Sequence, residues 1–280
     1  MFKIKFMILG AATLLCSVNA SSQSLDAGYG QFGAMVYWQG ELPPADGAQI
    51  VRTSEGNNEE MRWTIRTAQT PEEVRHNLNR KPPVFKDLFS FTEQTTTLFL
   101  DRLVGAPSVE RIPYYQFPSV LYALGLAVWD TTVVHGETYR YRIMIDGAAV
   151  DDGVLLRTEL STDFDWLPTF TSASYDRLDI QSRWHIPYEK RAEVITFLGY
   201  RSPAPQPDFR TVDGIREFTV VNDSLFAVFT DTTNTEMGVY YYIIRPVNRY
   251  GELGPISEYA QGASFPSIQN RCWSLSRLPV

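Results

Sequence analysis

The chain has 280 residues, 44% of them hydrophobic and 20% charged, a composition that excludes a disordered protein and suits one large or two ordinary domains. Its net charge of −7 disfavours binding to a phosphate backbone, so no nucleic-acid partner is expected. Aromatic residues make up 13% of the chain, including 15 Tyr and 6 Trp, which favours β structure.

Residues 1–20 have the three-part layout of a secretory signal peptide. Two lysines precede an apolar run over residues 6–16, and the small side chains of Val18 and Ala20 suit cleavage before Ser21. The run is shorter than the roughly 20 apolar residues of a membrane-spanning helix. We therefore expect export to the periplasm, cell surface or medium without a membrane span. Because the signal holds two lysines and no acid, cleavage would lower the net charge from −7 to −9.

The mature chain would keep one cysteine, Cys272, because Cys16 lies in the signal. An intramolecular disulfide is then impossible, which fits a bacterial exported protein better than a eukaryotic one. Cys272 either cross-links two chains or is a small, partly buried apolar residue. It belongs to a C-terminal tail over residues 266–280, which is either loosely held or docked through Trp273 and Leu275.

The first half, residues 25–160, contains short β-rich runs separated by turn residues. Strands are expected over residues 34–38, 49–52, 123–129, 136–145 and 154–160. In the fourth run Tyr139 and Tyr141 alternate with polar residues, which places both tyrosines on one face of the strand.

Residues 57–119 do not fit a plain sandwich and indicate a helical insertion. Thr70 is an expected N-cap, followed by proline at the first helical position and by Glu73 at the capping-box position. Apolar residues at roughly helical spacing fill residues 83–105. Since loops and insertions on rigid scaffolds carry function, this segment should hold whatever is particular to the protein.

The second half gives the clearer strand pattern, and the domain boundary is expected near residues 160–168. From Leu178 to Trp184, apolar and polar residues alternate, as in a half-buried strand. Further strands are expected over residues 193–200, 216–221, 224–229, 238–248 and 255–260, with an Asn-Asp turn that predicts a hairpin between the second and third of these. Short strands at this spacing predict an all-β sandwich.

Residues 240–257 resemble the late strand, turn and last strand of a fibronectin type III domain. Tyr240, Tyr242 and Ile244 match the alternating inward positions of that family's Tyr-x-apolar-x-apolar pattern, and an Asn and a Gly-bearing turn follow. Pro246 departs from the family's usual Ala and suggests an edge or a bulge in the strand.

Earlier parts of the chain extend the resemblance. Trp184 matches the family's core tryptophan on the second strand, and Tyr200 with the following arginine matches the end of its third. Residues 25–160 read as a divergent copy. The resemblance implies two tandem fibronectin type III-like β-sandwiches, at residues 25–160 and 168–265, the first with the helical insertion. Tyr240 would be the corner tyrosine that bonds an upstream backbone group, and the structural core would include Trp38, Tyr139, Tyr141, Trp184, Tyr200, Tyr240 and Tyr242.

The sequence shows no catalytic constellation. Its three histidines, His76, His135 and His185, have no metal-ligand spacing, and no cysteine pair supports them. It contains no Gly-x-Ser-x-Gly elbow and no phosphate-binding glycine loop. We expect no catalytic residue, no metal and no cofactor, and therefore a protein that is not an enzyme.

Two groups of residues are candidate binding sites. Asp163, Asp165 and Trp166 could form a calcium or sugar contact, or the aspartates could simply cap turns. A second group comprises Tyr114, Tyr115 and Phe117 between two prolines. These aromatics form either an exposed stacking platform or the contact between the insertion and the sheet.

The sequence thus favours a non-enzymatic exported binding, adhesion or scaffold module of the cell envelope, whose partner is a protein or a surface polysaccharide. The alternative is a carbohydrate-binding accessory protein, or a degenerate carbohydrate-active protein, that uses loop aromatics. A third possibility is a fragment of a longer multi-domain surface protein. Fold analogy alone does not separate these functions.

Overall fold

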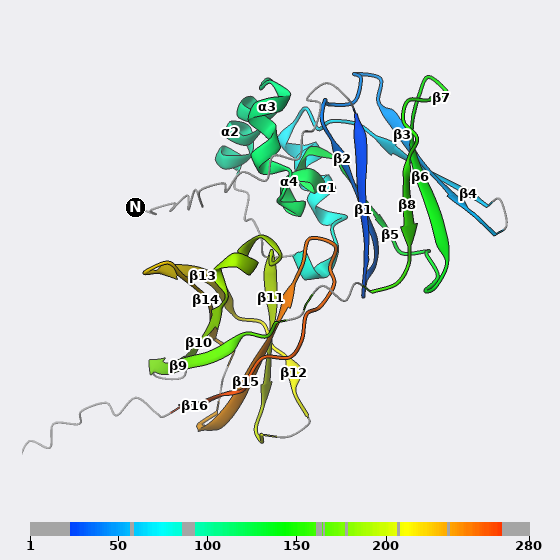
Figure 1. The fold of residues 1–280 in the computed structure, drawn as a ribbon. Coiled ribbons are helices and arrows are strands. Elements are labelled where there is room, and N and C mark those ends of the chain that lie inside the picture. The colour runs from blue at the N-terminus through cyan, green and yellow to red at the C-terminus, as the bar shows by residue number, and fades with distance from the viewer. Residues whose placement is uncertain are drawn as a thin grey trace, which may run out of the picture. The chain divides into compact units, whose positions relative to one another are not determined.

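The computed structural model describes residues 23–56, 59–85, 93–160, 164, 166–176, 179–205, 208–233 and 236–264 (Figure 1). The expected signal peptide, the tail over residues 266–280, Cys272, Asp163 and Asp165 lie outside these residues. The chain divides into two compact units: Met1–Thr162 with Asn248–Leu253, and Asp163–Val247 with Gly254–Val280. Both are built mainly from antiparallel strands, so the expected all-β class is confirmed. None of the helices among the described residues is long and apolar enough to cross a membrane.

The first unit holds two sheets of antiparallel strands. One has the order β1-β2-β5, formed by β1 (Ser24–Gly30), β2 (Gly33–Gln39) and β5 (Ala127–Asp130). The other has the order β4-β3-β6-β7, with β8 also paired to β6; its strands are β3 (Ala48–Ser54), β4 (Glu60–Ile65), β6 (Thr138–Ile145), β7 (Ala148–Ala149) and β8 (Val154–Arg157).

Strand β2 is buried on both faces, which explains its continuous apolar sequence from Ala34 to Trp38. The Tyr122 ring, on the insertion, packs edge-on against Tyr37 at 6.4 Å between centroids. Its hydroxyl lies 3.5 Å from the Met35 sulfur. The insertion therefore covers one face of this sheet and completes the core of the unit.

The helical insertion has different bounds from those expected. It comprises α1 (Pro71–Asn79), η1 (Pro83–Phe85), α2 (Glu93–Leu103), α3 (Ser108–Arg111), η2 (Ile112–Tyr114) and α4 (Pro118–Leu124). The predicted start at 57 is wrong, because Glu60–Ile65 alternates between exposed and partly or fully buried residues and forms strand β4.

The end of the insertion at 119 and the strand over 123–129 are also incorrect, because apolar residues up to Leu124 continue α4. Gly125 ends that helix in the left-handed conformation at φ 77°, and a Cβ there would lie 2.4 Å from the Arg66 carbonyl oxygen. The chain can enter β5 only after this cap, so the strand begins at Ala127.

The first unit also contains the segment Asn248–Leu253, so its predicted limits of 25–160 are incomplete. Arg249 forms an ion pair of 3.0 Å with Asp26, and the Tyr250 hydroxyl donates to the same carboxylate at 2.7 Å. The Tyr250 ring lies against Gly28, where a Cβ would stand 2.3 Å from the ring. Glycine at position 28 is what permits this close approach.

The second unit also consists of two sheets. One has the order β13-β14-β10-β9, with β9 (Thr169–Asp176), β10 (Asp179–Ile186), β13 (Ile215–Val221) and β14 (Ser224–Asp231). The other has the order β12-β11-β15-β16, with β11 (Thr196–Ser202), β12 (Arg210–Thr211), β15 (Gly238–Val247) and β16 (Ala260–Ser264). A short 3₁₀ helix, η3 (Tyr188–Ala192), precedes β11. Buried residues of β10, β11, β14 and β15 form one shared core.

The predicted hairpin is present as β13 and β14, and its turn residues Asn222 and Asp223 have φ values of 48° and 58°. The closing strand is misplaced in the prediction: it spans Ala260–Ser264 rather than 255–260. The reason is local, since the Ser257 hydroxyl accepts the Ile244 amide at 2.9 Å in place of a backbone carbonyl. Ladder pairing with β15 resumes only at Ala260.

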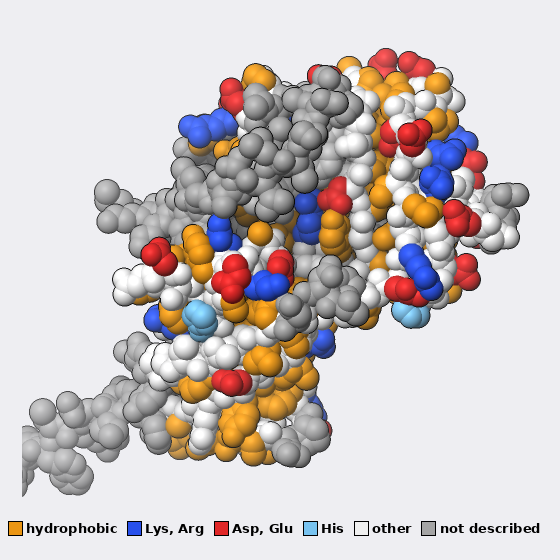
Figure 2. Space-filling view, in the orientation of Figure 1, with side chains coloured by type: hydrophobic (Ala, Val, Ile, Leu, Met, Phe, Trp, Pro, Cys, Tyr) orange, Lys and Arg blue, Asp and Glu red, His pale blue; other side chains and the backbone are white. Residues whose placement is uncertain are grey.

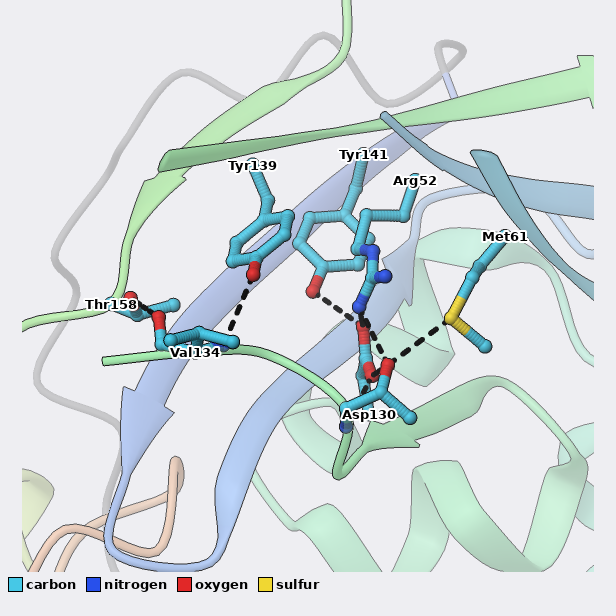
Figure 3. Close-up of polar contacts among 8 residues, drawn as sticks. Arg52, Met61, Asp130, Val134, Tyr139, Tyr141 and Thr158 are labelled. Carbon is cyan, nitrogen blue, oxygen red and sulfur yellow. Dashed lines mark hydrogen bonds and ion pairs between the residues drawn. The ribbon is translucent and has the colours of Figure 1, made fainter. Parts of the chain in front are cut away.

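Both units bury the same polar cluster. In the first, Asp130 at the end of β5 accepts hydrogen bonds from Arg52 at 2.8 Å, from Tyr141 at 2.9 Å and from the Thr132 amide at 2.9 Å (Figure 3). Arg52 and Tyr141 come from β3 and β6 of the facing sheet. The carboxylate therefore joins the two sheets.

In the second unit Asp231 ends β14 and accepts from Arg201 at 2.8 Å, from Tyr242 at 3.0 Å and from the Thr233 amide at 2.8 Å. The tyrosine follows the aspartate by eleven residues in both units. We conclude that β5 and β14 hold equivalent positions in the two units.

Replacing Asp130 by Asn tests the contribution of this cluster. The ion pair with Arg52 is buried, with 2% and 0% of the two side chains exposed. Removing the Asp130 charge leaves the Arg52 charge buried without its partner. Asp130→Asn should therefore lower the free energy of unfolding by about 3 kcal/mol, measured by urea denaturation. Glu72→Gln, at the exposed pair with Arg75, is the control and should change it by about 0.5 kcal/mol at most. Equal effects of the two substitutions on the free energy of unfolding would contradict the conclusion that the buried Asp130 cluster stabilises the unit.

The clusters also predict a loss of stability in alkali. Burial, and then the charge of Asp130 or Asp231, raises the pKa of Tyr141 and Tyr242 well above the usual value. In the unfolded chain tyrosine ionises near pH 10, so stability should hold below about pH 10 and fall as the pH rises beyond it. Tyr141→Phe and Tyr242→Phe should each flatten the fall of the urea midpoint above about pH 10. If the urea midpoint of each variant falls with pH as steeply as that of the unsubstituted chain, ionisation of these tyrosines does not cause the loss of stability.

Candidate functional site

A groove of about 460 Å³ lies in the first unit where the insertion meets the ends of both sheets. One wall is β4 with the residues that follow it, Trp63 to Ala68. The second wall is one side of α1, and the third is formed by Tyr122, Gly125 and the β5 residues Ala127, Val128 and Trp129.

Helix α1 presents its polar side to the groove. Glu72, His76 and Arg80 are spaced four residues apart, and Glu73 and Asn77 form a second row beside them. Val74 and Leu78 face the other way into a small apolar cluster. The capping box fixes the start of this helix: Thr70 Oγ1 accepts the Glu73 amide, and Glu73 Oε2 accepts the Thr70 amide, both at 3.2 Å.

Most polar groups of α1 already have partners within the protein. Glu73 is held by the capping box, and Glu72 forms a 2.6 Å ion pair with Arg75. Asn77 donates to the Ala123 carbonyl at 3.4 Å. These acids are bound to structural partners, an arrangement that does not prepare either of them for proton transfer to a ligand.

Arg66, Thr67 and Arg80 are among the lining groups that have no partner within the described residues, as is the exposed His76. The guanidinium groups of Arg66 and Arg80 are exposed and make no hydrogen bond or ion pair within the described residues. The Thr67 side chain is 6% exposed, and its buried hydroxyl oxygen also has no hydrogen-bond partner there. Within the described residues the groove therefore offers two free positive charges, and the Thr67 hydroxyl is buried beneath its surface without a hydrogen-bond partner.

The aromatic residues Tyr114, Tyr115 and Phe117 do not form an exposed platform. Tyr115 is 3% exposed, its hydroxyl donates to the Gly40 carbonyl at 2.8 Å, and it accepts from Arg111 at 3.2 Å. Tyr114 and Phe117 are half-buried. The platform interpretation is wrong at Tyr115, because this residue joins the insertion to the residue that follows β2.

Trp166 also has a structural environment. It packs against the core of the second unit, and its indole N–H donates to Glu193 at 3.0 Å. Its neighbours Asp163 and Asp165 fall outside the described residues, so their role stays a prediction. Within the described parts of the chain, no three His, Cys, Asp or Glu side chains are grouped to hold a metal ion.

The tyrosines and tryptophans named as core residues differ in burial. Trp38, Trp184, Tyr141 and Tyr242 are fully buried and Tyr139 is 5% exposed, whereas Tyr200 and Tyr240 are half-buried. Tyr240 donates to the upstream Glu236 carbonyl at 3.3 Å, and Tyr139 accepts the upstream Val134 amide at 3.0 Å. In both units a tyrosine thus ties its strand to the preceding loop.

The surface carries no large area of one charge on the face that Figure 2 shows. Acidic and basic side chains are intermixed over the first unit there. The unpaired arginines of the groove stand out against the acidic balance of the whole chain, −7.

No protein-family model matches the chain, and no curated protein matches it. Among solved structures it is similar to the crystal structure of a beta-1,2-glucanase from Parabacteroides distasonis, at 13% sequence identity and a TM-score of 0.31. The similarity covers 84% of this chain and 31% of the glucanase chain, so the chain spans about a third of that protein's length. A likeness at this level supports no conclusion about activity.

Proposed function

We propose that this protein is a non-enzymatic binding module of the cell envelope, exported by its N-terminal signal, whose first unit recognises a partner through the groove. The partner is a protein or a surface polysaccharide. The observation that carries the proposal is the set of unsatisfied groups in one groove, namely Arg66, Thr67 and Arg80. Arg66 and Arg80 are exposed, so each can bind an anionic group of a ligand, whereas the buried Thr67 hydroxyl lacks, within the described residues, the hydrogen bond that buried polar groups normally make.

We propose further that both units are fibronectin type III-like sandwiches. In the lettering of such sandwiches, β1, β2 and β5 of the first unit would be strands A, B and E. In the second unit β9, β10, β13 and β14 would be strands A, B, D and E. The other sheet of each unit would hold strands C, F and G with a short C′ strand. Trp38 and Trp184 would be the core tryptophans of the B strands. The tyrosine contacts of Tyr139 and Tyr240 support this assignment, because a corner tyrosine is a feature of these folds.

A binding role suits the groove better than catalysis. Its two glutamates are engaged in a helix cap and an ion pair, and Arg66 and Arg80 are guanidinium ions, which bind anions and do not exchange protons near neutral pH. His76 lines the groove as a single imidazole, and both glutamates beside it on α1 are already engaged. Such a groove can hold and orient a charged partner.

The carbohydrate alternative keeps one supporting observation. Trp63 and Trp129 both line the groove and are partly exposed, and aromatic rings of this kind stack on sugar rings. Sugar binding would therefore use these groove residues rather than Tyr114 and Tyr115.

The test compares two double variants of the full chain in a glycan array and in capture from envelope extract. Arg66→Ala/Arg80→Ala removes both free charges of the groove, whereas Arg62→Ala/Arg157→Ala removes two exposed arginines of the same unit that do not line it. We expect at least one ligand to be lost with the groove variant and retained with the control, because only the groove variant removes ligand contacts. Identical binding profiles for both variants would overturn the proposal.

A further inference from the structure

Strand β5 of the first unit lacks a neighbour that its counterpart in the second unit has. The two strands are equivalent because each ends in the aspartate of the buried cluster and each pairs with a tryptophan-bearing strand, β2 or β10. In the second unit the other side of β14 pairs along seven residues with β13. In the first unit the sheet stops at β5.

The open side of β5 lies in the groove. In an antiparallel pair, every second residue directs its backbone N–H and C=O to the neighbouring strand. The Trp38 amide donates to the Leu126 carbonyl, so residues 126, 128 and 130 bond toward β2. The backbone groups of Ala127 and Trp129 therefore point away from β2, and both residues line the groove. Within the described residues β5 pairs with β2 and with no other strand.

Strand β4, the edge strand of its sheet among the described residues, also borders the groove. It pairs with β3 on one side, and its residues Trp63, Thr64 and Ile65 line the groove. Unpaired edges are a liability in β proteins and are usually covered or blunted, or else they receive another strand. Two such edges at one groove favour an extended ligand over a compact one.

The charged and polar groups of the groove define the chemistry of that ligand. Among the residues that the structure describes, Arg66 and Arg80 have no acidic partner and the Thr67 hydroxyl has no hydrogen-bond partner. Acidic side chains of a ligand would pair with the two exposed arginines. In the second unit β13 packs Phe218 and Val220, two positions apart, against the core, and we expect the same alternation from a strand at the equivalent site.

We propose that the groove binds an extended acidic segment of a partner protein, which adds to β5 as a fourth strand at the position that β13 holds in the second unit. The proposal rests on the binding function assigned to the groove above and names the class of its partner. Main-chain hydrogen bonds to Ala127 and Trp129 would supply affinity, and Arg66 and Arg80 would select acidic sequences. The four residues of β5 span about 13 Å, enough for a matching segment of about four residues.

The experiment pans a library of random eight-residue displayed peptides against the purified full chain. Enriched peptides should be acidic, with apolar residues at alternating positions. The best synthetic peptide should bind the Arg66→Ala/Arg80→Ala variant about tenfold more weakly or worse, and the Arg62→Ala/Arg157→Ala control with unchanged affinity.

A second measurement separates strand addition from simple charge attraction. Methylating the peptide nitrogens at alternate residues removes the main-chain donors on one edge and leaves the charges, so one of the two methylated series should lose binding. Absence of enriched peptides, or binding that survives both series, would overturn strand addition. If binding of a glycan or a folded protein still depends on Arg66 and Arg80, the binding function of the groove stands without strand addition. If no binding depends on these arginines, both proposals fail.

Discussion

A buried carboxylate at the end of one strand organises each unit of this protein. Asp130 and Asp231 accept hydrogen bonds from an arginine and a tyrosine of the facing sheet and from a threonine two residues on. Burying a carboxylate is costly unless it is paired and hydrogen-bonded, so the cluster favours the register of the two sheets that brings these partners together. The cluster thus fixes the relative position of the layers as well as binding them.

The two units share this cluster but differ in the sheet that carries the aspartate, which is β1-β2-β5 in the first unit and β13-β14-β10-β9 in the second. In the second unit the hairpin of β13 and β14 adds a fourth strand beside the aspartate-bearing strand. In the first unit the described residues between β4 and β5 form helices instead, which cover one face of β2, and no described strand pairs with the second edge of β5. The groove, its free arginines and its open edges follow from this replacement. A connection that is only structural in one unit becomes a candidate recognition site in the other.

Much of the strand pattern was predictable because it depends on local sequence. The alternation from Ile180 to Trp184 and the Asn222-Asp223 turn specify a strand and a hairpin without help from distant residues. Residues 118–124 were harder, since a continuous apolar run fits a buried strand as well as a buried helix, and only the left-handed Gly125 decides between them. The spacing of Asp130 to Tyr141 and of Asp231 to Tyr242 was also visible in the sequence as an internal repeat.

The site was not predictable in the same way. Trp63, Arg66 and Arg80 are unremarkable residues of a strand, a connection and a helix end, and they meet only through tertiary packing. Two signals could have helped: the alternation over residues 60–65, which marks β4, and the four-residue spacing of polar residues on α1. Neither reveals which groups stay unpaired, because that depends on the partners that the fold supplies to the others.

The most direct test of the account is amide hydrogen exchange of the free full chain, read residue by residue by NMR. Ala127 and Trp129 should exchange quickly, because their amides point to an open edge. Their counterparts Val228 and Thr230, which lie opposite Glu217 and Ile215 of β13, should exchange slowly. Equal protection of the two pairs would mean that the edge of β5 is already covered, which would contradict a groove built to receive a strand.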